Sequence, residues 1–164
     1  MKGGIGTASL QGPNGLIVGA IVAVNAVGSI IDRRTGLPVA GVRAADGVTL
    51  EDPFALIRGM SGLAGRELEN TTIGVVATNA RLTKAQALRV SMMAQDGLAR
   101  AIYPSHTPGD GDTLFVLATG GLTEEPNVSR IGSLAAEAVS DAILRAVREA
   151  TGLPGFPAVR DLKK

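Results

Sequence analysis

The order of hydrophobic patterns along the chain constrains its fold more than any other feature. Four stretches have the short apolar runs of β-strands, and two longer stretches repeat apolar residues with the period of an α-helix. The strand-like stretches span residues 5–10, 16–27, 71–78 and 113–119, and the helical ones span 83–102 and 129–150. The tripeptide Pro13-Asn14-Gly15 predicts a hairpin turn between the first two strands. The expected order is therefore hairpin, strand, helix, strand, helix.

Composition indicates what fills the space between these elements. Hydrophobic residues make up 45% of the 164 residues, yet aromatic residues make up only 2% and tryptophan is absent. The core must therefore consist of Ala, Val, Ile and Leu, which pack closely between helix and sheet layers. With Thr83 as a plausible N-cap, the periodicity predicts that the first long helix turns Ala85, Leu88, Met92, Ala99 and Ile102 to the core. For the second, the predicted core positions are Ala136, Val139, Ile143, Val147 and Ala150. On its exposed side, Glu137, Asp141 and Arg145 have the i, i+4 spacing of interacting side chains. We expect an α/β (α+β) fold in a single domain over residues 1–164.

Charge and cysteine content exclude several functions. The formal net charge is +1, from 16 basic and 15 acidic residues. With few aromatic residues and no basic stripe, the chain has no electrostatic footprint or stacking platform for nucleic acid. It has no cysteine and only one histidine, so neither a thiolate nor a histidine-based zinc site can form. No cofactor and no metal are expected.

The apolar segments do not predict a membrane protein. The first residues contain a single lysine and lack the apolar stretch of a signal peptide. The longest apolar run, residues 16–31, is interrupted by Gly19, Asn25, Gly28 and Ser29 and is too short to span a bilayer. A soluble, cytoplasmic protein is expected.

Two carboxylates stand directly before the last strand-like stretch, at Asp110 and Asp112. In an extended backbone, side chains two residues apart point to the same side, so this pair can share a proton or orient an amine. A polar turn that enters a strand accounts for the same residues, because Asp and Gly are common in turns. A calcium loop is disfavoured, since the EF-hand spacing and its distal Glu are absent.

Other polar residues are weaker candidates. Asn25 lies inside a predicted strand, where a buried amide costs free energy unless it is satisfied. His106 with Ser91 or Ser105 could supply a serine triad, but no Gly-x-Ser-x-Gly elbow frames either serine. His106 is therefore expected to be a loop residue. The N-terminal Lys-Gly-Gly-Ile-Gly lacks the ending of a phosphate-binding loop.

The sequence Asn70-Thr71-Thr72 opens the third strand-like stretch. A threonine hydroxyl can act as a nucleophile when a base takes its proton, and that base can be the residue's own free α-amine. Such chemistry requires that the chain be cut immediately before the threonine. Taken alone, two threonines at this position are more typical of strand formation.

Four segments together resemble a known family: KGGIGTASL, VGAIVAVNAVGSIID, NTTIGVVATNARLTKAQ and MAQDGLARAIYPSHTPGDGDTLFVLATG. They are similar, in order and over nearly the whole chain, to the self-processing L-aminopeptidase/D-esterase and β-peptidyl aminopeptidase family, which includes the nylon-oligomer endo-hydrolase. The resemblance implies an N-terminal-nucleophile-like hydrolase with an αββα sandwich. It also implies oligomers and peptide or amide substrates.

The resemblance also implies roles for individual residues. The matching cleavage bond is Asn70–Thr71, which would give an α-chain part of residues 1–70 and a β chain of residues 71–164. Thr71 would be the nucleophile that forms an acyl-enzyme. Asp110 and Asp112 match the pair that holds the amine and hydroxyl of the nucleophile, and Asn25 matches the asparagine that stabilises the oxyanion.

The chain departs from the family pattern at its beginning. Family precursors are longer, and their upstream part carries further strands, an active-site lysine and an aromatic hydroxyl in the substrate pocket. This sequence starts where the family sequence is midway, so we expect an N-terminally truncated chain with an exposed sheet edge and exposed apolar surface.

Two other functions stay open at this stage. The chain could be a catalytically inactive fragment or interaction module of the same fold. It could also be an acyltransferase similar to the ornithine acetyltransferases, which share self-cleavage before a threonine.

Overall fold

A β-hairpin opens the fold in the computed structural model, which describes residues 1–59 and 70–162. Its strands are β1 (Gly4–Gln11) and β2 (Ile17–Val24), joined by the short helical turn η1 (Pro13–Gly15). Asn14 and Gly15 have φ angles of 58° and 77°, a left-handed conformation that Asn and Gly adopt at little cost. The predicted hairpin is confirmed.

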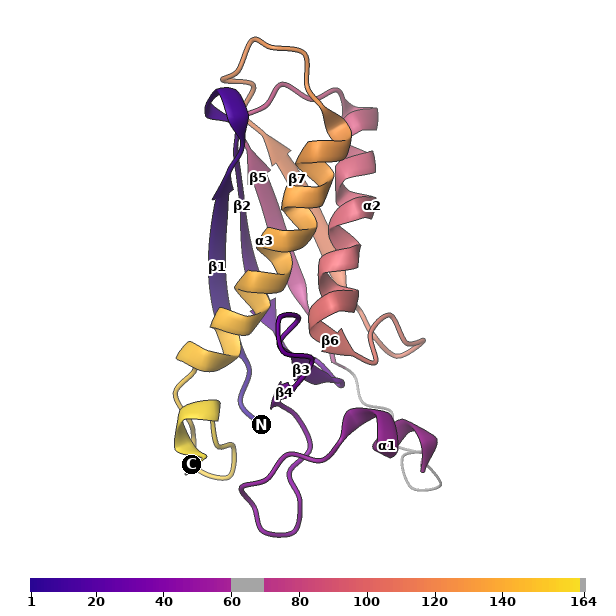
Figure 1. Ribbon diagram of the computed structural model, residues 1–164, viewed down its shortest axis with the longest axis vertical. Helices are drawn as coiled ribbons and strands as arrows, with labels where there is room; N and C mark the ends of the chain where they lie inside the picture. Colours follow the sequence, from indigo (N-terminus) through magenta and orange to yellow (C-terminus); the bar gives the residue numbers. More distant parts are fainter. Residues whose placement is uncertain (60–69, 163–164) are drawn as a thin grey trace.

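The hairpin belongs to a four-stranded sheet whose strand order is β1-β2-β5-β7. β5 (Ile73–Thr78) pairs antiparallel with β2 and parallel with β7 (Thr113–Ala118). Two helices, α2 (Lys84–Ala101) and α3 (Val128–Glu149), cover the same face of this sheet (Figure 1). The predicted order of hairpin, strand, helix, strand and helix is therefore confirmed.

Local sequence signals determine where the helices begin. The Thr83 hydroxyl accepts a hydrogen bond from the Gln86 N–H at 3.2 Å, and the Gln86 side chain accepts one from the Thr83 N–H at 2.9 Å. This capping box satisfies two backbone donors at the start of α2. Asn127 caps α3 in a similar way, and Asp52 caps the short helix α1 (Pro53–Arg58).

The predicted core face of the first long helix is wrong at four of its five positions and confirmed only at Ile102, which is buried at the start of β6. Leu88 and Met92 are exposed, while the buried positions of α2 are Val90, Ala94, Gly97, Leu98 and Ala101. The reason is the close approach of α3. A Cβ atom at Gly97 would collide with the backbone oxygen of Ala136, so small residues determine which side of α2 faces inward. The predicted core face of α3 is confirmed, since Ala136, Val139, Ile143, Val147 and Ala150 are all buried.

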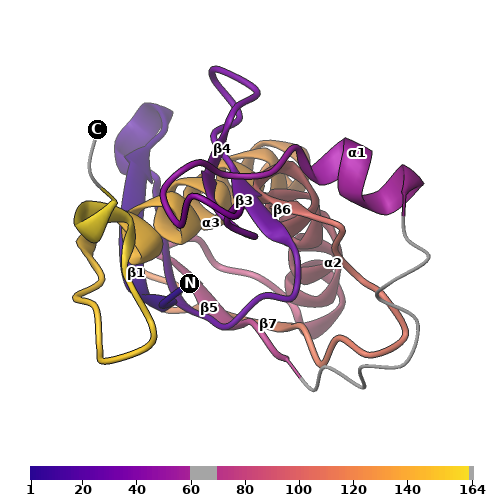
Figure 2. The same ribbon diagram turned by 90° about the horizontal axis from the view of Figure 1, so that it is seen from below.

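The second face of the main sheet is uncovered by the described residues (Figure 2). Its exposed side chains alternate with the buried ones along each strand. The large ones among them are Ile5, Ile17, Ile21, Ile73, Phe115 and Leu117. The apolar sequence of β7 is typical of a buried strand, yet β7 is half exposed and lies at the edge of the sheet order. The described residues thus supply one helical layer and one main sheet of the predicted sandwich.

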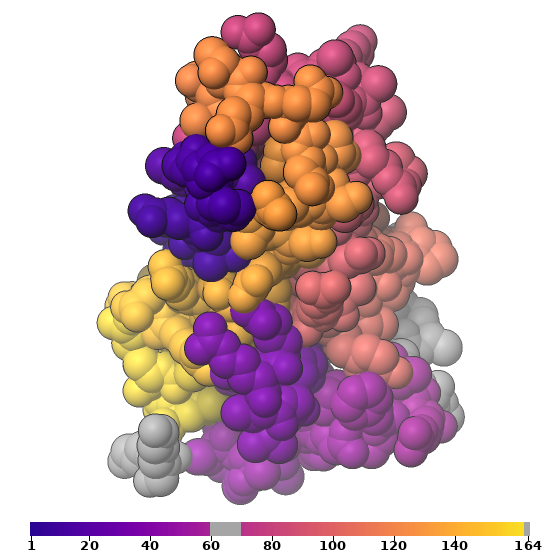
Figure 3. All heavy atoms as spheres, turned by 45° about the horizontal axis from the view of Figure 1, so that its top comes forward, coloured from indigo at the N-terminus to yellow at the C-terminus, as the bar shows by residue number. Residues whose placement is uncertain are grey.

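A small second sheet lies beside one end of the main sheet and has the order β4-β3-β6 (Figure 2). Its strands are β3 (Ser29–Ile31), β4 (Pro38–Ala40) and β6 (Ile102–Tyr103). The segment between β2 and α1 gathers at this same end in the space-filling view (Figure 3). A last helical turn, η2 (Val159–Asp161), follows α3.

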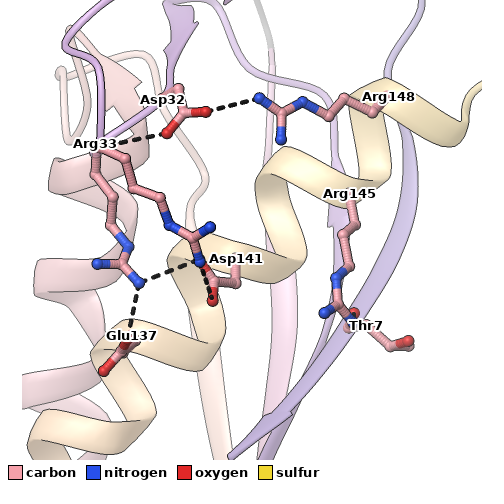
Figure 4. A network of polar contacts seen from close by, with 8 residues as sticks. Thr7, Asp32, Arg33, Glu137, Asp141, Arg145 and Arg148 are labelled. Carbon is pink, nitrogen blue, oxygen red and sulfur yellow. Dashed lines mark hydrogen bonds and ion pairs between the residues drawn. The ribbon is translucent and has the colours of Figure 1, made fainter.

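Ion pairs fasten the turn after β3 to α3 (Figure 4). Arg33 contacts Glu137 at 2.8 Å and Asp141 at 3.3 Å, and Arg148 contacts Asp32 at 2.7 Å. We expected Glu137, Asp141 and Arg145 to interact with one another along α3, and that expectation is wrong. The acidic pair binds Arg33, while the guanidinium of Arg145 donates to the carbonyl oxygen of Thr7 at 3.0 Å.

Candidate active site

The predicted site residues gather at one end of the main sheet, where β2 ends and where β5 and β7 begin. β5 and β7 are parallel, so their first residues lie side by side, and the antiparallel β2 ends at the same place. The segments before β5 and before β7 continue this pairing, with a parallel bridge between Asn70 and Asp110. The topology thus brings together residues that are far apart in the sequence.

The Asn70–Thr71 peptide bond is held on both sides. The Thr71 N–H donates to the Asn25 carbonyl oxygen at 3.1 Å, and the Gly111 N–H donates to the Asn70 carbonyl oxygen at 3.2 Å. These bonds extend the pairing of β5 with β2 and with β7 by one step beyond the strand. The bond that would be cut therefore lies in a fixed position between two neighbouring segments.

The Asp112 carboxylate fixes the next peptide unit. Its Oδ1 accepts a hydrogen bond from the Thr72 N–H at 2.8 Å. Burial raises the pKa of Asp112 above its ordinary value, and the nearby charge of Asp110 raises it further. The hydrogen bond from Thr72 and the charge of His106 act in the opposite direction. A carboxyl group with a raised pKa keeps its proton to a higher pH than an exposed aspartate does.

Asp110 forms two hydrogen bonds within its own loop. Its Oδ2 accepts from the Thr107 N–H at 2.8 Å, and its N–H donates to the Thr107 carbonyl oxygen at 2.9 Å. The two bonds close the turn before β7. His106, in the same turn, has a φ of 56° and is exposed, consistent with the loop residue that the sequence predicts.

Asn25 differs from its prediction. β2 ends at Val24, so Asn25 lies just after the strand, and its side chain is exposed. The expected burial of a polar amide inside a strand is wrong because the ladder stops one residue earlier. Its backbone carbonyl, and not its amide, makes the observed contact with Thr71. Within residues 1–59 and 70–162, no hydrogen bond to this exposed amide is found.

A pocket of about 430 Å³ opens beside Asn25. Its wall includes Lys2, Val24, Ala40 and Arg43, and none of its described lining residues is acidic. Of the predicted site residues, only Asn25 lines it. The pocket therefore lies next to the Asn70–Thr71 segment, through a residue whose backbone contacts Thr71.

Gly111 is a site residue that the sequence analysis missed. A Cβ atom built on Gly111 would lie 2.5 Å from the Thr71 hydroxyl oxygen and 3.3 Å from its methyl carbon. The hydroxyl thus lies directly against the glycine backbone. The sequence marks Gly111 only by its position between two aspartates, and a turn accounts equally well for a glycine at that position.

Neither a metal-binding cluster nor a membrane-spanning helix is found in residues 1–59 and 70–162. These residues contain no group of three or more His, Asp or Glu side chains arranged to hold a metal ion. In the same part of the chain, no helix combines the length and hydropathy needed to cross a bilayer.

The layered α/β architecture corresponds to the N-terminal-nucleophile hydrolase fold. A solved structure with this fold covers 91% of this chain and 41% of its own chain, at 20% identity and a TM-score of 0.57. It is described as an L-aminopeptidase D-Ala-esterase/amidase from Ochrobactrum anthropi, a variant of that fold. At this identity, the match shows the fold alone.

The chain belongs to Peptidase family S58, whose model matches residues 1–160. It is 39% identical over 180 residues to an uncharacterized aminopeptidase of Mycobacterium tuberculosis, covering 99% of this chain and 52% of the relative. It is 30% identical over 142 residues to a 6-aminohexanoate-oligomer endohydrolase of Kocuria sp., covering 79% of this chain and 40% of the relative. The family resemblance inferred from the sequence is confirmed. The chain spans about half the length of the curated relatives that it matches.

Proposed function

We propose that this protein is a self-processing N-terminal-threonine aminopeptidase or amidohydrolase. In this proposal the chain is cut between Asn70 and Thr71, which gives residues 1–70 and 71–164. The observation that carries the proposal is the fixed peptide bond before Thr71, held from one side by Asn25 and from the other by Gly111. A bond fixed in this way keeps its carbonyl carbon within reach of the adjacent hydroxyl, which favours an intramolecular reaction.

After cleavage, Thr71 would become both the N-terminus and the nucleophile. Its hydroxyl would attack a substrate amide carbonyl, its own α-amine would relay the proton, and water would hydrolyse the acyl-enzyme. Asp110 and Asp112 would hold the amine and hydroxyl of Thr71. The exposed Asn25 amide would stabilise the oxyanion from the rim of the pocket.

Substrates in this proposal are peptides or small amides that release an N-terminal amino acid, or related oligomers. The names of two relatives, an aminopeptidase and a 6-aminohexanoate-oligomer endohydrolase, support that range. The pocket beside Asn25 supports a substrate of small-molecule size. A panel of amino-acid amides, dipeptides and aminohexanoate oligomers would test it, with Thr71→Ala as the inactive control.

We propose further that the protein is a homo-oligomer, with the uncovered sheet face of one copy packed on that of a second copy. The exposed positions on this face of β1, β2, β5 and β7 carry no charged residue, so two copies could meet without like-charge repulsion. Apolar side chains of two such faces can interdigitate as in a β-sandwich. This observation equally favours the second candidate function, an interaction module without turnover.

Light scattering after size exclusion tests the association. Phe115 is 58% exposed on the sheet face, and Leu88 is 62% exposed on α2. We expect a dimer for the wild type and for Leu88→Glu, and a monomer for Phe115→Glu. A monomeric wild type at all concentrations would contradict the association, and an oligomer that never turns over any amide would favour the interaction module.

We also propose that the protein is located in the cytoplasm. Fractionation of cells that produce the protein would check it, with recovery in the membrane or secreted fraction as the contrary result.

A further inference from the structure

Gly111 contacts both groups that react in the proposed self-cleavage. Its N–H donates to the carbonyl oxygen of Asn70 at 3.2 Å. On its other side, the position that a Cβ would take lies only 2.5 Å from the Thr71 hydroxyl oxygen. One residue therefore meets the carbonyl that would be attacked and the hydroxyl that would attack it.

We propose that Gly111 is a catalytic residue of self-cleavage, a role that rests on the proposed function of the Asn70–Thr71 bond. Its N–H stabilises the negative charge that develops on the Asn70 oxygen, and its missing side chain leaves the space that the Thr71 hydroxyl needs. The glycine is required by this contact and not by its backbone conformation, because its φ lies outside the left-handed region where glycine is favoured.

The reaction that Gly111 assists is an N-to-O acyl shift followed by hydrolysis. The Thr71 oxygen forms a bond to the Asn70 carbonyl carbon, and the carbonyl oxygen becomes an oxyanion opposite the Gly111 N–H. The C–N bond to Thr71 then breaks, and the hydroxyl proton ends on the departing nitrogen, which becomes the α-amine. Water hydrolyses the resulting ester to the Asn70 carboxyl group and the free Thr71 hydroxyl. Peptide and water are consumed, and acid and amine are formed.

The Gly111 N–H differs from the other hydrogen-bonding groups next to the Asn70–Thr71 peptide bond, because it is a donor. The Asn25 carbonyl holds the Thr71 N–H, and the Asp112 carboxylate holds the Thr72 N–H. Both are acceptors, so neither can stabilise an oxyanion. Gly111 supplies the hydrogen-bond donor found on the Asn70 oxygen among the described residues.

The test compares cleavage rates of freshly translated chains. The 164-residue wild type, Gly111→Ala and Gly121→Ala are made in a cell-free system, and loss of the uncut chain is followed on gels. Gly121 is the matched control, since a Cβ there would lie 3.8 Å from its nearest neighbour. We expect Gly111→Ala to cleave about 100-fold more slowly, because a misplaced nucleophile loses the near-attack geometry. The control should cleave like the wild type.

A second variant removes only the donor. Replacing Gly111 by glycolic acid through nonsense suppression converts its N–H into an oxygen without adding a side chain. We expect cleavage to slow by about 100- to 1,000-fold, as when an oxyanion-hole donor is removed. This variant decides the outcome if circular dichroism shows that Gly111→Ala does not fold.

The possible outcomes separate the two proposals. If the wild type is cut and either folded variant is cut equally fast, the role of Gly111 is overturned while self-cleavage stands. If the wild type and Gly121→Ala both stay uncut, self-cleavage of this chain and the role of Gly111 fall together.

Discussion

Replacing Asp112 by Asn should slow self-cleavage by a modest and calculable factor. The Asp112 carboxylate accepts the Thr72 N–H at 2.8 Å, one residue beyond the proposed nucleophile. A hydrogen bond to a charged acceptor contributes roughly 1.5–3 kcal/mol, and a neutral one about 0.5–1.5 kcal/mol. The change therefore costs about 1–1.5 kcal/mol, which corresponds to roughly 5- to 13-fold in rate if the bond acts by positioning Thr71.

Asp112→Ala should slow the reaction further. It leaves the Thr72 N–H without its acceptor, and Thr72 is fully buried. An unsatisfied buried donor costs about 1–3 kcal/mol, or roughly 5- to 160-fold in rate. Pulse-chase cleavage of freshly translated chains measures both variants.

Asp46→Asn is the matched control. Its carboxylate also accepts backbone N–H groups, from Val48 and Thr49, but in an exposed loop that forms no hydrogen bond to Asn70, Thr71 or Thr72. It should cleave at the wild-type rate. A loss of more than about 1,000-fold for Asp112→Asn would refute the positioning role, because that size is typical of removing a group that itself transfers a proton. Wild-type rates for both Asp112 variants would refute any role.

Two further predictions concern stability. Asp32→Ala should lower the free energy of unfolding by about 1.5–3 kcal/mol, since its carboxylate binds Arg148 at 2.7 Å and the Arg34 N–H at 3.0 Å. The hydrogen bond from the Arg34 N–H, followed in size by the one from Arg148, lowers the pKa of Asp32 below its ordinary value of 3.8. The contribution of Asp32 to the free energy of unfolding is therefore present above pH 3.8 and is lost as the pH falls through the lowered pKa. Urea unfolding of both proteins at neutral and acidic pH measures this, and a gap that persists in acid would contradict it. Gly97→Val should cost roughly 1–3 kcal/mol or prevent folding, because its side chain would enter the α2–α3 contact. Thermal unfolding beside Gly121→Ala measures it, and an unchanged midpoint would contradict the packing described.

Local signals predicted much of the fold. The Pro13-Asn14-Gly15 turn and the N-cap at Thr83 depend on residues that are neighbours in the chain, so a short stretch of sequence is enough to predict them. The core face of α3 was also predictable, because large apolar residues recur on one side of it.

Nonlocal packing explains what the sequence did not predict. The buried side of α2 depends on how closely α3 approaches Gly97, which periodicity in α2 cannot reveal. Glu137 and Asp141 both pair with Arg33, which lies over a hundred residues earlier in the chain. Asn25 was placed in a strand because apolar residues surround it, yet the ladder ends at Val24.

The candidate site also combines residues that the sequence predicted with one that only the structure reveals. Family motifs pointed to Asn25, Thr71, Asp110 and Asp112, and the topology brings their segments to one end of the sheet. Gly111 carries no chemical group in its side chain, so only its hydrogen bond to Asn70 and its contact with Thr71 mark it.

Intact-mass spectrometry of the purified protein shows whether the chain cuts itself before Thr71. We expect a fragment whose sequence begins at Thr71 in the wild type, and only the uncut chain in Thr71→Ala. A folded wild type that stays uncut, or a cut that persists in Thr71→Ala, would contradict it.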